Sequence, residues 1–264
     1  MGTATMPSVR LDRPTTRYFD ERVPPDVPAY EFDIMAGLLA DYELSLEPGQ
    51  LPLGRGNTFA QMGGELLDAL DRPLPAPDVL VLAYHLPDLH VADVAACALA
   101  ERCGGASASF SVSEQGIGAG FTALRILRGL RNAGTAADGA VMVFDQSTSF
   151  YHDADTHDLP ITDTAVLLRT DPKPGAGAVL EFLDESAVDD ATDGLRDLMH
   201  RYPDADLIIG RGLAASEADP RRLCTDVWAS LAERWPLNRL TLVADYDRHA
   251  GRLFAAGLRP EATP

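Results

Sequence analysis

The side chains best suited to binding a metal gather in one short stretch, residues 151–158. Within it, His152, Asp155 and His157 could approach a single ion. Metal sites usually fix their ligands at a regular spacing, and these three follow no i, i+4 helical pattern. A solvated polar loop is the ordinary setting for such a segment. We therefore expect no metal site in this chain, and we expect no cofactor.

The three cysteines, Cys97, Cys103 and Cys224, have no metal-ligand spacing either. An odd number of cysteines in a reducing compartment argues for free thiols. Cys97 and Cys224 fall within apolar helical patterns, which predicts that they pack in the interior and do not react.

A Gly-rich turn, Gly116-Ile-Gly-Ala-Gly120, separates a strand-like segment from a helical one. Residues 106–112 alternate small polar side chains with Ala, Phe and Val, and the apolar spacing after the turn predicts a helix that runs to Arg131. The N-terminus of such a helix would lower the pKa of a thiol placed there. The residue in the turn is Ile117, which has no ionisable group.

Composition excludes several classes of partner. The chain has 264 residues, is 46% hydrophobic and carries 40 acidic against 22 basic residues, for a net charge of -18. This charge disfavours nucleic acid and anionic membranes. No apolar run approaches the ~20 residues of a membrane-spanning helix, and the N-terminus lacks the pattern of a signal peptide. We expect a cytoplasmic protein with a substantial core.

Two stretches about half the chain apart follow the same order of helix, strand, helix, strand. The predicted ranges are 59–70, 78–84, 91–102 and 106–112 in the first unit, and 191–201, 206–210, 220–234 and 239–244 in the second. Short apolar runs that alternate with helices indicate parallel sheets covered on both faces. We assign residues 1–55 to an irregular leader with a Pro-rich run at 22–28 and the first elements, 56–170 to one half and 171–264 to the other.

This duplication, closed in its first unit by the turn at Ile117, resembles the thiolase fold of ketosynthase III and plant-type polyketide synthases. The resemblance implies an α/β protein of pseudo-duplicated αβαβα layers. Ile117 stands where that family has its nucleophilic cysteine, and Asp163 lies on the aspartate of a conserved family strand. The family continues beyond a point equivalent to residues 250–257, expected here as helix, so the second half is expected to be shortened. The residues that fit the small-Gly-x-x-x-Leu pattern after the family cysteine are Gly116, Gly118, Ala119, Gly120 and Leu124.

The resemblance also locates the two other catalytic positions. Arg211 falls on the family histidine and Arg248 on the family asparagine, and a slip of one residue would place His249 there instead. Decarboxylative condensation needs a thiolate and two hydrogen-bonding groups that stabilise an enolate. Isoleucine forms no thioester, and guanidinium groups stay protonated and cannot act as bases. The resemblance therefore implies no catalytic residue in this chain.

A chain of this kind is similar to the nucleophile-less subunit of the heterodimeric condensing enzymes that make alkylquinolones, and to chain-length factors. The implied partner is a catalytically complete ketosynthase III-like subunit, through which acyl-coenzyme A or an acyl carrier protein would be reached. Two alternatives stay open: a stand-alone acyltransferase or hydrolase that uses His249, Asp247 or Arg211, and a homodimeric acyl-thioester-binding protein. The expected interface strand consists of Ala106, Ser107, Ala108, Ser109, Phe110, Ser111 and Val112.

Overall fold

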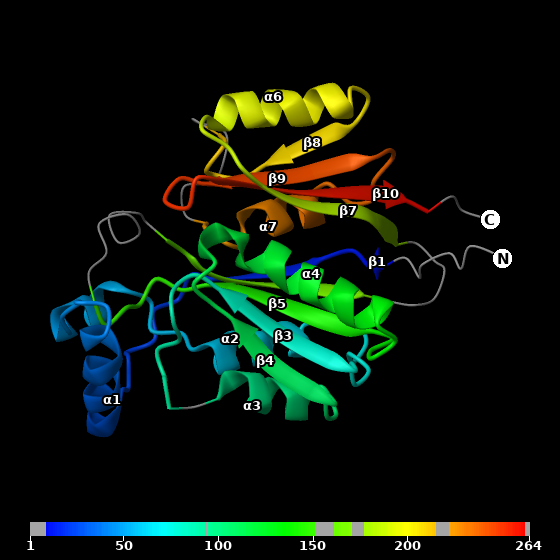
Figure 1. The fold of residues 1–264 in the computed structure, drawn as a ribbon. Coiled ribbons are helices and arrows are strands. Elements are labelled where there is room, and N and C mark those ends of the chain that lie inside the picture. Colours follow the sequence, from blue (N-terminus) through cyan, green and yellow to red (C-terminus); the bar gives the residue numbers. More distant parts are fainter. Residues whose placement is uncertain (1–8, 93, 152–160, 171–176, 215–221, 262–264) are drawn as a thin grey trace.

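The computed structural model describes residues 9–92, 94–151, 161–170, 177–214 and 222–261. Figure 1 shows five layers, stacked from bottom to top as helices, sheet, helices, sheet and helix. The predicted αβαβα arrangement is therefore confirmed. The helices of the bottom, middle and top layers are α2 (Phe59–Asp68) and α3 (Ala95–Arg102), then α4 (Ala119–Asn132) and α7 (Asp226–Glu233), then α6 (Ala191–Arg201).

The first sheet is mixed, which corrects the expectation of a parallel sheet. β3 pairs in parallel with β4 and β5, whereas β6 pairs antiparallel with both β5 and β2. A strand that is buried on both faces has a continuous apolar run whether it pairs in parallel or antiparallel. The sequence therefore did not reveal that β6 runs antiparallel to β5. The strands of this sheet are β4 (Ala108–Val112), β3 (Val79–Tyr84), β5 (Gly139–Asp145), β6 (Asp163–Thr170) and β2 (Thr15–Phe19).

Alternate residues of the first sheet enter two different cores. Val81 and Val143 belong to the same buried cluster as the apolar face of α4, whereas Leu82 and Met142 pack with α2 and α3. This alternation follows from the two-residue repeat of a strand. The sheet is thereby held between two helical layers, and the carboxyl ends of β3, β4 and β5 lie at one edge.

The second sheet combines a parallel pair, β8 and β9, with two antiparallel strands, β7 and β10. The short strand β1 (Arg10–Leu11) pairs with both β6 and β7, so one hydrogen-bonded path runs through both sheets. Both predicted units are present, each as helix, strand, helix and strand. The strands of the second sheet are β7 (Ala178–Ala187), β10 (Arg252–Pro260), β9 (Thr241–Asp247) and β8 (Asp206–Ile209).

The helix expected over residues 250–257 is wrong, because the structure forms β10 there. Four consecutive residues, Leu253 to Ala256, are at most 3% exposed. The strand is paired on both sides, by β7 and by β9, and helical layers cover both faces of the sheet. Alanine-rich sequence favours helix only weakly, and this pairing overrides that preference.

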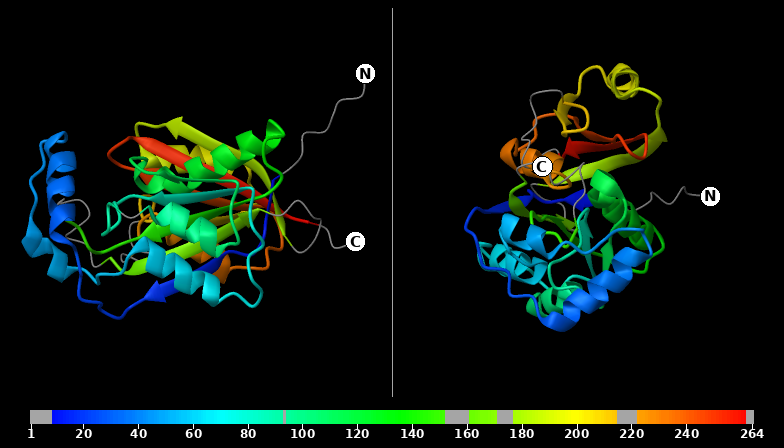
Figure 2. Two further views of the ribbon diagram at one scale, coloured as in Figure 1. Left: turned by 90° about the horizontal axis from the view of Figure 1, so that it is seen from below. Right: turned by 90° about the vertical axis from the view of Figure 1, so that its left-hand side faces the viewer.

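The N-terminal segment is more regular than expected. Residues 22–28 are irregular as predicted, but β1, β2, α1 (Ala29–Ala40) and η1 (Pro48–Leu53) also lie within residues 1–55. β2 extends the first sheet, pairing Thr15 with Leu167. Helix α1 stands at the margin of the molecule, away from both sheets (Figures 1 and 2).

Helix α4 occupies the centre of the molecule. Its apolar side chains Phe121, Leu124 and Leu127 are buried. Its N-terminal glycines permit close packing, because a Cβ on Gly118 would collide with the Phe254 ring and a Cβ on Gly120 with the indole of Trp228. The start of the helix is therefore fixed between α7 and β10.

Candidate functional site

The structure places Ile117 in a single 3-10 turn, η2 (Gly116–Gly118), between β4 and the first residue of α4. Gly116 has a φ of 51°, a conformation that favours glycine. The amide of Gly118 donates to the carbonyl of Gln115 over 3.0 Å, which closes the turn. The side chain held at the helix N-terminus is thus a partly buried isoleucine.

The carboxylate of Asp247 packs against this turn. A Cβ on Gly116 would collide with Oδ2 of Asp247, while Oδ1 accepts hydrogen bonds from the amides of His249 and Ala250, each over 2.9 Å. Asp247 is the last residue of β9 and is 8% exposed. A carboxylate therefore fills the space beside Gly116. From the sequence, Asp247 was expected to act only if the chain were a stand-alone acyltransferase or hydrolase.

Arg211 lies in the turn after β8, half-buried beside the end of β9. The amide of the next residue, Gly212, donates to Oδ1 of Asp245 over 2.8 Å, and a Cβ on Gly212 would collide with the carbonyl of Tyr246. The three segments chosen by the resemblance therefore meet, since the segment of Arg211 contacts the end of β9 and Asp247 contacts the turn of Ile117.

Arg248 and His249 follow β9 in a turn, and both are exposed. In the described part of the chain, the contact between this segment and Gly116 is made by Asp247, one residue before the position assigned to the family asparagine. The sequence could not show whether Asp247 or Arg248 contacts the turn. The fold decides this, because it determines which residue is the last of β9 with its side chain pointing inward.

Asp245 is a buried acid two residues before Asp247. Burial raises its pKa to about 8, and the charges of Asp226 and Asp247 act in the same direction. The amides of Tyr246 and Gly212 oppose this shift, because both donate to Oδ1 over 2.8 Å. Asp245 therefore carries a proton at neutral pH.

Cys224 also contacts the turn. Its Sγ donates to the carbonyl of Gly116 over 3.3 Å, and it is 1% exposed. The adjacent carboxylate of Asp145 accepts hydrogen bonds from the amides of Leu223, Cys224 and Thr225. Burial raises the pKa of the Cys224 thiol well above its usual value, and the charge of Asp145 raises it further. This cysteine is a thiol, not a thiolate.

The cysteines are free, as predicted, but Cys97 is exposed, which corrects its assignment to the core. In α3, the residues that face the core are Ala95, Ala96, Leu99 and Ala100, and Cys97 lies outside that stripe. Cys103 and Cys224 are buried. The contact of Cys224 with Gly116 spans 108 residues, and no local pattern could have revealed it.

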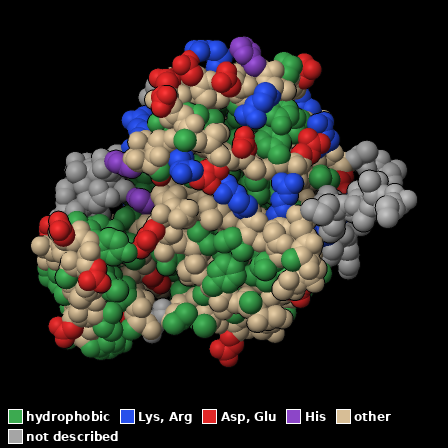
Figure 3. Space-filling model, in the orientation of Figure 1, with side chains coloured by type: hydrophobic (Ala, Val, Ile, Leu, Met, Phe, Trp, Pro, Cys, Tyr) green, Lys and Arg blue, Asp and Glu red, His purple; other side chains and the backbone are tan. Residues whose placement is uncertain are grey.

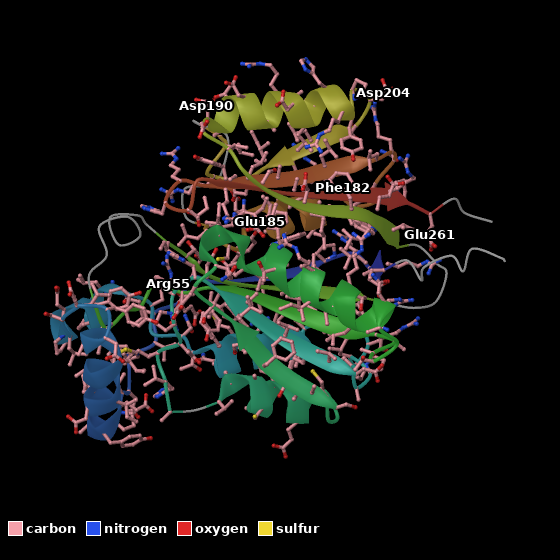
Figure 4. The ribbon with its side chains drawn as sticks, viewed as in Figure 1. Arg55, Phe182, Glu185, Asp190, Asp204 and Glu261 are labelled. Carbon is pink, nitrogen blue, oxygen red and sulfur yellow. The ribbon has the colours of Figure 1, made fainter. Side chains whose placement is uncertain are left out.

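Two basic residues of α4 have partners in the fold, and one of them, Arg125, joins the middle layer to the second sheet. The side chain of Glu185 on β7 accepts hydrogen bonds from Arg125 on α4 and from Arg252 on β10 (Figure 4). The hydrogen bond from Arg125 is the main reason that the pKa of Glu185 is lowered. Further along α4, Arg131 donates to the carbonyl of Ala137 over 2.8 Å. Arg125 and Arg131 thus have structural partners.

Asp163, which the resemblance aligned with a family aspartate, is fully buried. It accepts hydrogen bonds from the Asn57 amide group over 2.9 Å and from both the backbone and the hydroxyl of Ser147 over 2.6 Å. Arg55, labelled in Figure 4, donates to the carbonyl of Ile161 close by. Burial raises the pKa of Asp163 despite these donors. Asp163 therefore joins the first sheet to the segment before α2.

Within the described residues, no group of three or more His, Cys, Asp or Glu side chains could hold a metal ion. The cluster of His152, Asp155 and His157 lies outside the described residues. Among the helices that the structure describes, none is long and apolar enough to cross a membrane.

No protein-family model and no curated protein matches the sequence. Solved structures do match. The tetronic acid condensing enzyme AbyA1 superposes with a TM-score of 0.61 at 16% identity, over 97% of this chain and 100% of that one. The 3-oxoacyl-(acyl carrier protein) synthase III FabH from Pseudomonas aeruginosa PAO1 gives 0.60 at 16%, over 97% and 100%. The ishigamide ketosynthase/chain length factor gives 0.60 at 13%, over 98% and 100%.

At these identities the likeness establishes the fold. The matched structures span nearly the whole chain, so the likeness extends over both halves of the fold. This chain therefore has the thiolase-like fold of ketosynthase III-type condensing enzymes.

Proposed function

We propose that this chain is the non-catalytic subunit of a heterodimeric, ketosynthase III-like condensing enzyme of specialised metabolism. The observation that carries the proposal is the turn at Ile117, which keeps a strand, turn and helix around a side chain that offers no nucleophile. In this role the chain supports the fold of its partner and shapes the partner's acyl pocket. Acyl-coenzyme A or an acyl carrier protein is bound through the partner.

The chemistry of condensation has no evident replacement at the turn. Ile117 cannot accept an acyl group, and the Arg211 guanidinium cannot act as a base. Cys224 is the thiol that contacts the turn, but it is buried, its pKa is raised, and it donates its proton to the carbonyl of Gly116. A thiol in this state is a poor nucleophile, because the thiolate is the reactive form.

The position of β4 supports association with a second subunit. It is an end strand of the sheet in the described part of the chain, paired with β3 alone. An open edge exposes unpaired backbone groups and favours pairing with another chain. The ishigamide neighbour, whose printed name combines a ketosynthase with a chain length factor, is consistent with such a pairing of subunits.

The direction of the backbone groups on β4 can be assigned. The amide of Ala108 donates to the carbonyl of Asp78 over 3.1 Å, so it points towards β3. Backbone groups alternate along a strand, and the amides of Ser109 and Ser111 therefore point outward, away from β3. Proline at either serine would remove an outward donor and leave the pairing with β3 in place.

The test is the assembly of this chain with a ketosynthase III-like protein that has an intact Cys-His-Asn set and is encoded beside its gene. We expect the two purified proteins to form a heterodimer in light scattering and the partner to lose activity without this chain. Ser109→Pro and Ser111→Pro should each weaken the heterodimer at least tenfold, whereas Ser111→Thr, which keeps the amide, should not.

Two results would contradict the proposal. One is a stable wild-type monomer in the presence of the cognate ketosynthase. The other is acyl transfer or hydrolysis by the isolated chain, lost on substitution of His249 or Asp247, which would establish the stand-alone enzyme instead.

A further inference from the structure

Helix α1 has apolar side chains on two faces that lie about 100° apart around the helix axis. Met35 and Leu39 face inward and are at most 5% exposed. On the neighbouring face, Tyr30, Ile34 and Leu38 recur every four residues and Tyr42 continues the series in the turn that follows, with exposures of 54%, 43%, 51% and 61%. Large apolar side chains exposed side by side in this way mark a surface for contact with another molecule. We call these four residues the outer stripe.

The outer stripe adjoins the open edge of the first sheet. The hydroxyl of Tyr42 donates to Oε1 of Glu114 over 2.6 Å, and Glu114 follows the last residue of β4 by two positions. Helix α1 also projects from the body of the molecule, so that its outer side is accessible (Figure 2). The helix and the edge strand therefore offer adjacent parts of one surface.

The surroundings of the outer stripe are strongly acidic. Residues 20–47 include eight acidic residues and a single basic one, Arg22. In Figure 3, red and green side chains mix at the lower left, where Figure 1 places α1, whereas the visible Lys and Arg side chains lie over the upper half. The acidic residues of the segment are Asp20, Glu21, Asp26, Glu31, Asp33, Asp41, Glu43 and Glu47.

The acidic charge around the outer stripe determines which kind of molecule can bind there. A second copy of the chain would meet the stripe through the same patch in a two-fold contact, bringing like charges face to face. An acidic carrier protein or the phosphates of coenzyme A would be repelled in the same way. A protein surface with an apolar centre and a rim of Lys and Arg would complement both the apolar stripe and the acidic rim.

We propose that the outer stripe of α1 is a docking surface for the partner subunit, which presents an apolar segment flanked by basic side chains. The inference rests on the proposed function, because it takes the partner to be the ketosynthase III-like subunit. It adds a second contact region beside the β4 edge and makes the heterodimer favoured over a homodimer of this chain.

The test compares variants of the full chain in binding the same ketosynthase III-like protein. Ile34→Lys with Leu38→Lys should weaken the heterodimer on the order of tenfold or more, because a buried apolar contact is replaced by charges that face a basic rim. Met199→Lys is the matched control, since Met199 lies on α6 and is 47% exposed. Because these side chains are exposed, neither change should lower the unfolding temperature.

A second arm addresses the charge. Asp33→Lys with Asp41→Lys should also weaken the heterodimer and reduce the dependence of its affinity on salt. If stripe and rim variants bind like the wild type while Ser111→Pro abolishes binding, the docking surface is refuted and the proposed function stands. If the wild-type chain forms no heterodimer, both fail. Loss of a homodimer of the chain alone in the stripe variant would make a second copy the occupant and overturn the inference.

Discussion

Replacing Asp245 by asparagine should make the protein less sensitive to pH. Asp245 is 1% exposed, and burial raises its pKa to about 8, so the folded protein keeps this proton well above the pH at which the unfolded chain releases it. Between these two pKa values the folded state binds more protons than the unfolded state. The free energy of unfolding therefore falls as the pH rises towards 8.

The magnitude follows from the two pKa values. With an unfolded pKa near 4 and a folded pKa of about 8, the Asp245 carboxyl should reduce the free energy of unfolding by about 2 kcal/mol between pH 6 and pH 8. The asparagine oxygen can still accept the hydrogen bonds from Gly212 and Tyr246, and the side chain does not ionise. The stability of Asp245→Asn relative to the wild type should rise by that amount over the same range.

The measurement is urea unfolding at pH 6 and pH 8, monitored by tryptophan fluorescence, to which the fully buried Trp228 and the partly buried Trp235 contribute. Taking the difference between variant and wild type at each pH removes the other groups that titrate in this range. Asp204→Asn is the control, because Asp204 is exposed in the turn before β8. If wild type and Asp245→Asn lose stability in parallel from pH 6 to pH 8, Asp245 is already ionised in the folded protein and the reasoning is wrong.

Three further predictions concern the turn. The isolated chain should form no covalent adduct with acyl-coenzyme A or acyl carrier substrates, and intact-protein mass spectrometry that finds an acyl group on a defined residue would contradict this. Ile117→Cys alone should not restore malonyl-thioester decarboxylation, because no enolate-stabilising pair accompanies the thiol; measurable decarboxylation by this variant would show that the catalytic positions are misassigned. Gly116→Ala should destabilise the fold by about 2 kcal/mol or more in urea unfolding, because the φ of Gly116 is positive and the new Cβ would collide with Asp247. Gly129→Ala in α4 is the control, because its Cβ would meet open space and should not destabilise the fold. Equal effects of the two substitutions would exclude the packing of Asp247 against Gly116.

Local patterns in the sequence were sufficient for the order of the elements. The apolar runs and the helical spacings predicted both units of helix, strand, helix and strand, because these signals depend on residues that are close along the chain. The αβαβα layers were implied by the resemblance of this duplication to the thiolase fold. The helix predicted after the turn is present as α4, with Phe121 and Leu124 buried on its inward side. Composition likewise predicted a substantial core, since 46% of the residues are hydrophobic.

Only the tertiary structure decided the features that depend on contacts between residues far apart in the sequence. The expected helix at residues 250–257 became β10 because β7 and β9 pair with it on both sides. Cys224 reached the carbonyl of Gly116 from 108 residues away, and Asp247, not Arg248, was brought against the turn. Asp245 gained its raised pKa from burial. The sequence by itself determined which side chain the turn holds, Ile117, while only the folded chain decided which groups surround it, because burial and contact depend on segments that the sequence keeps far apart.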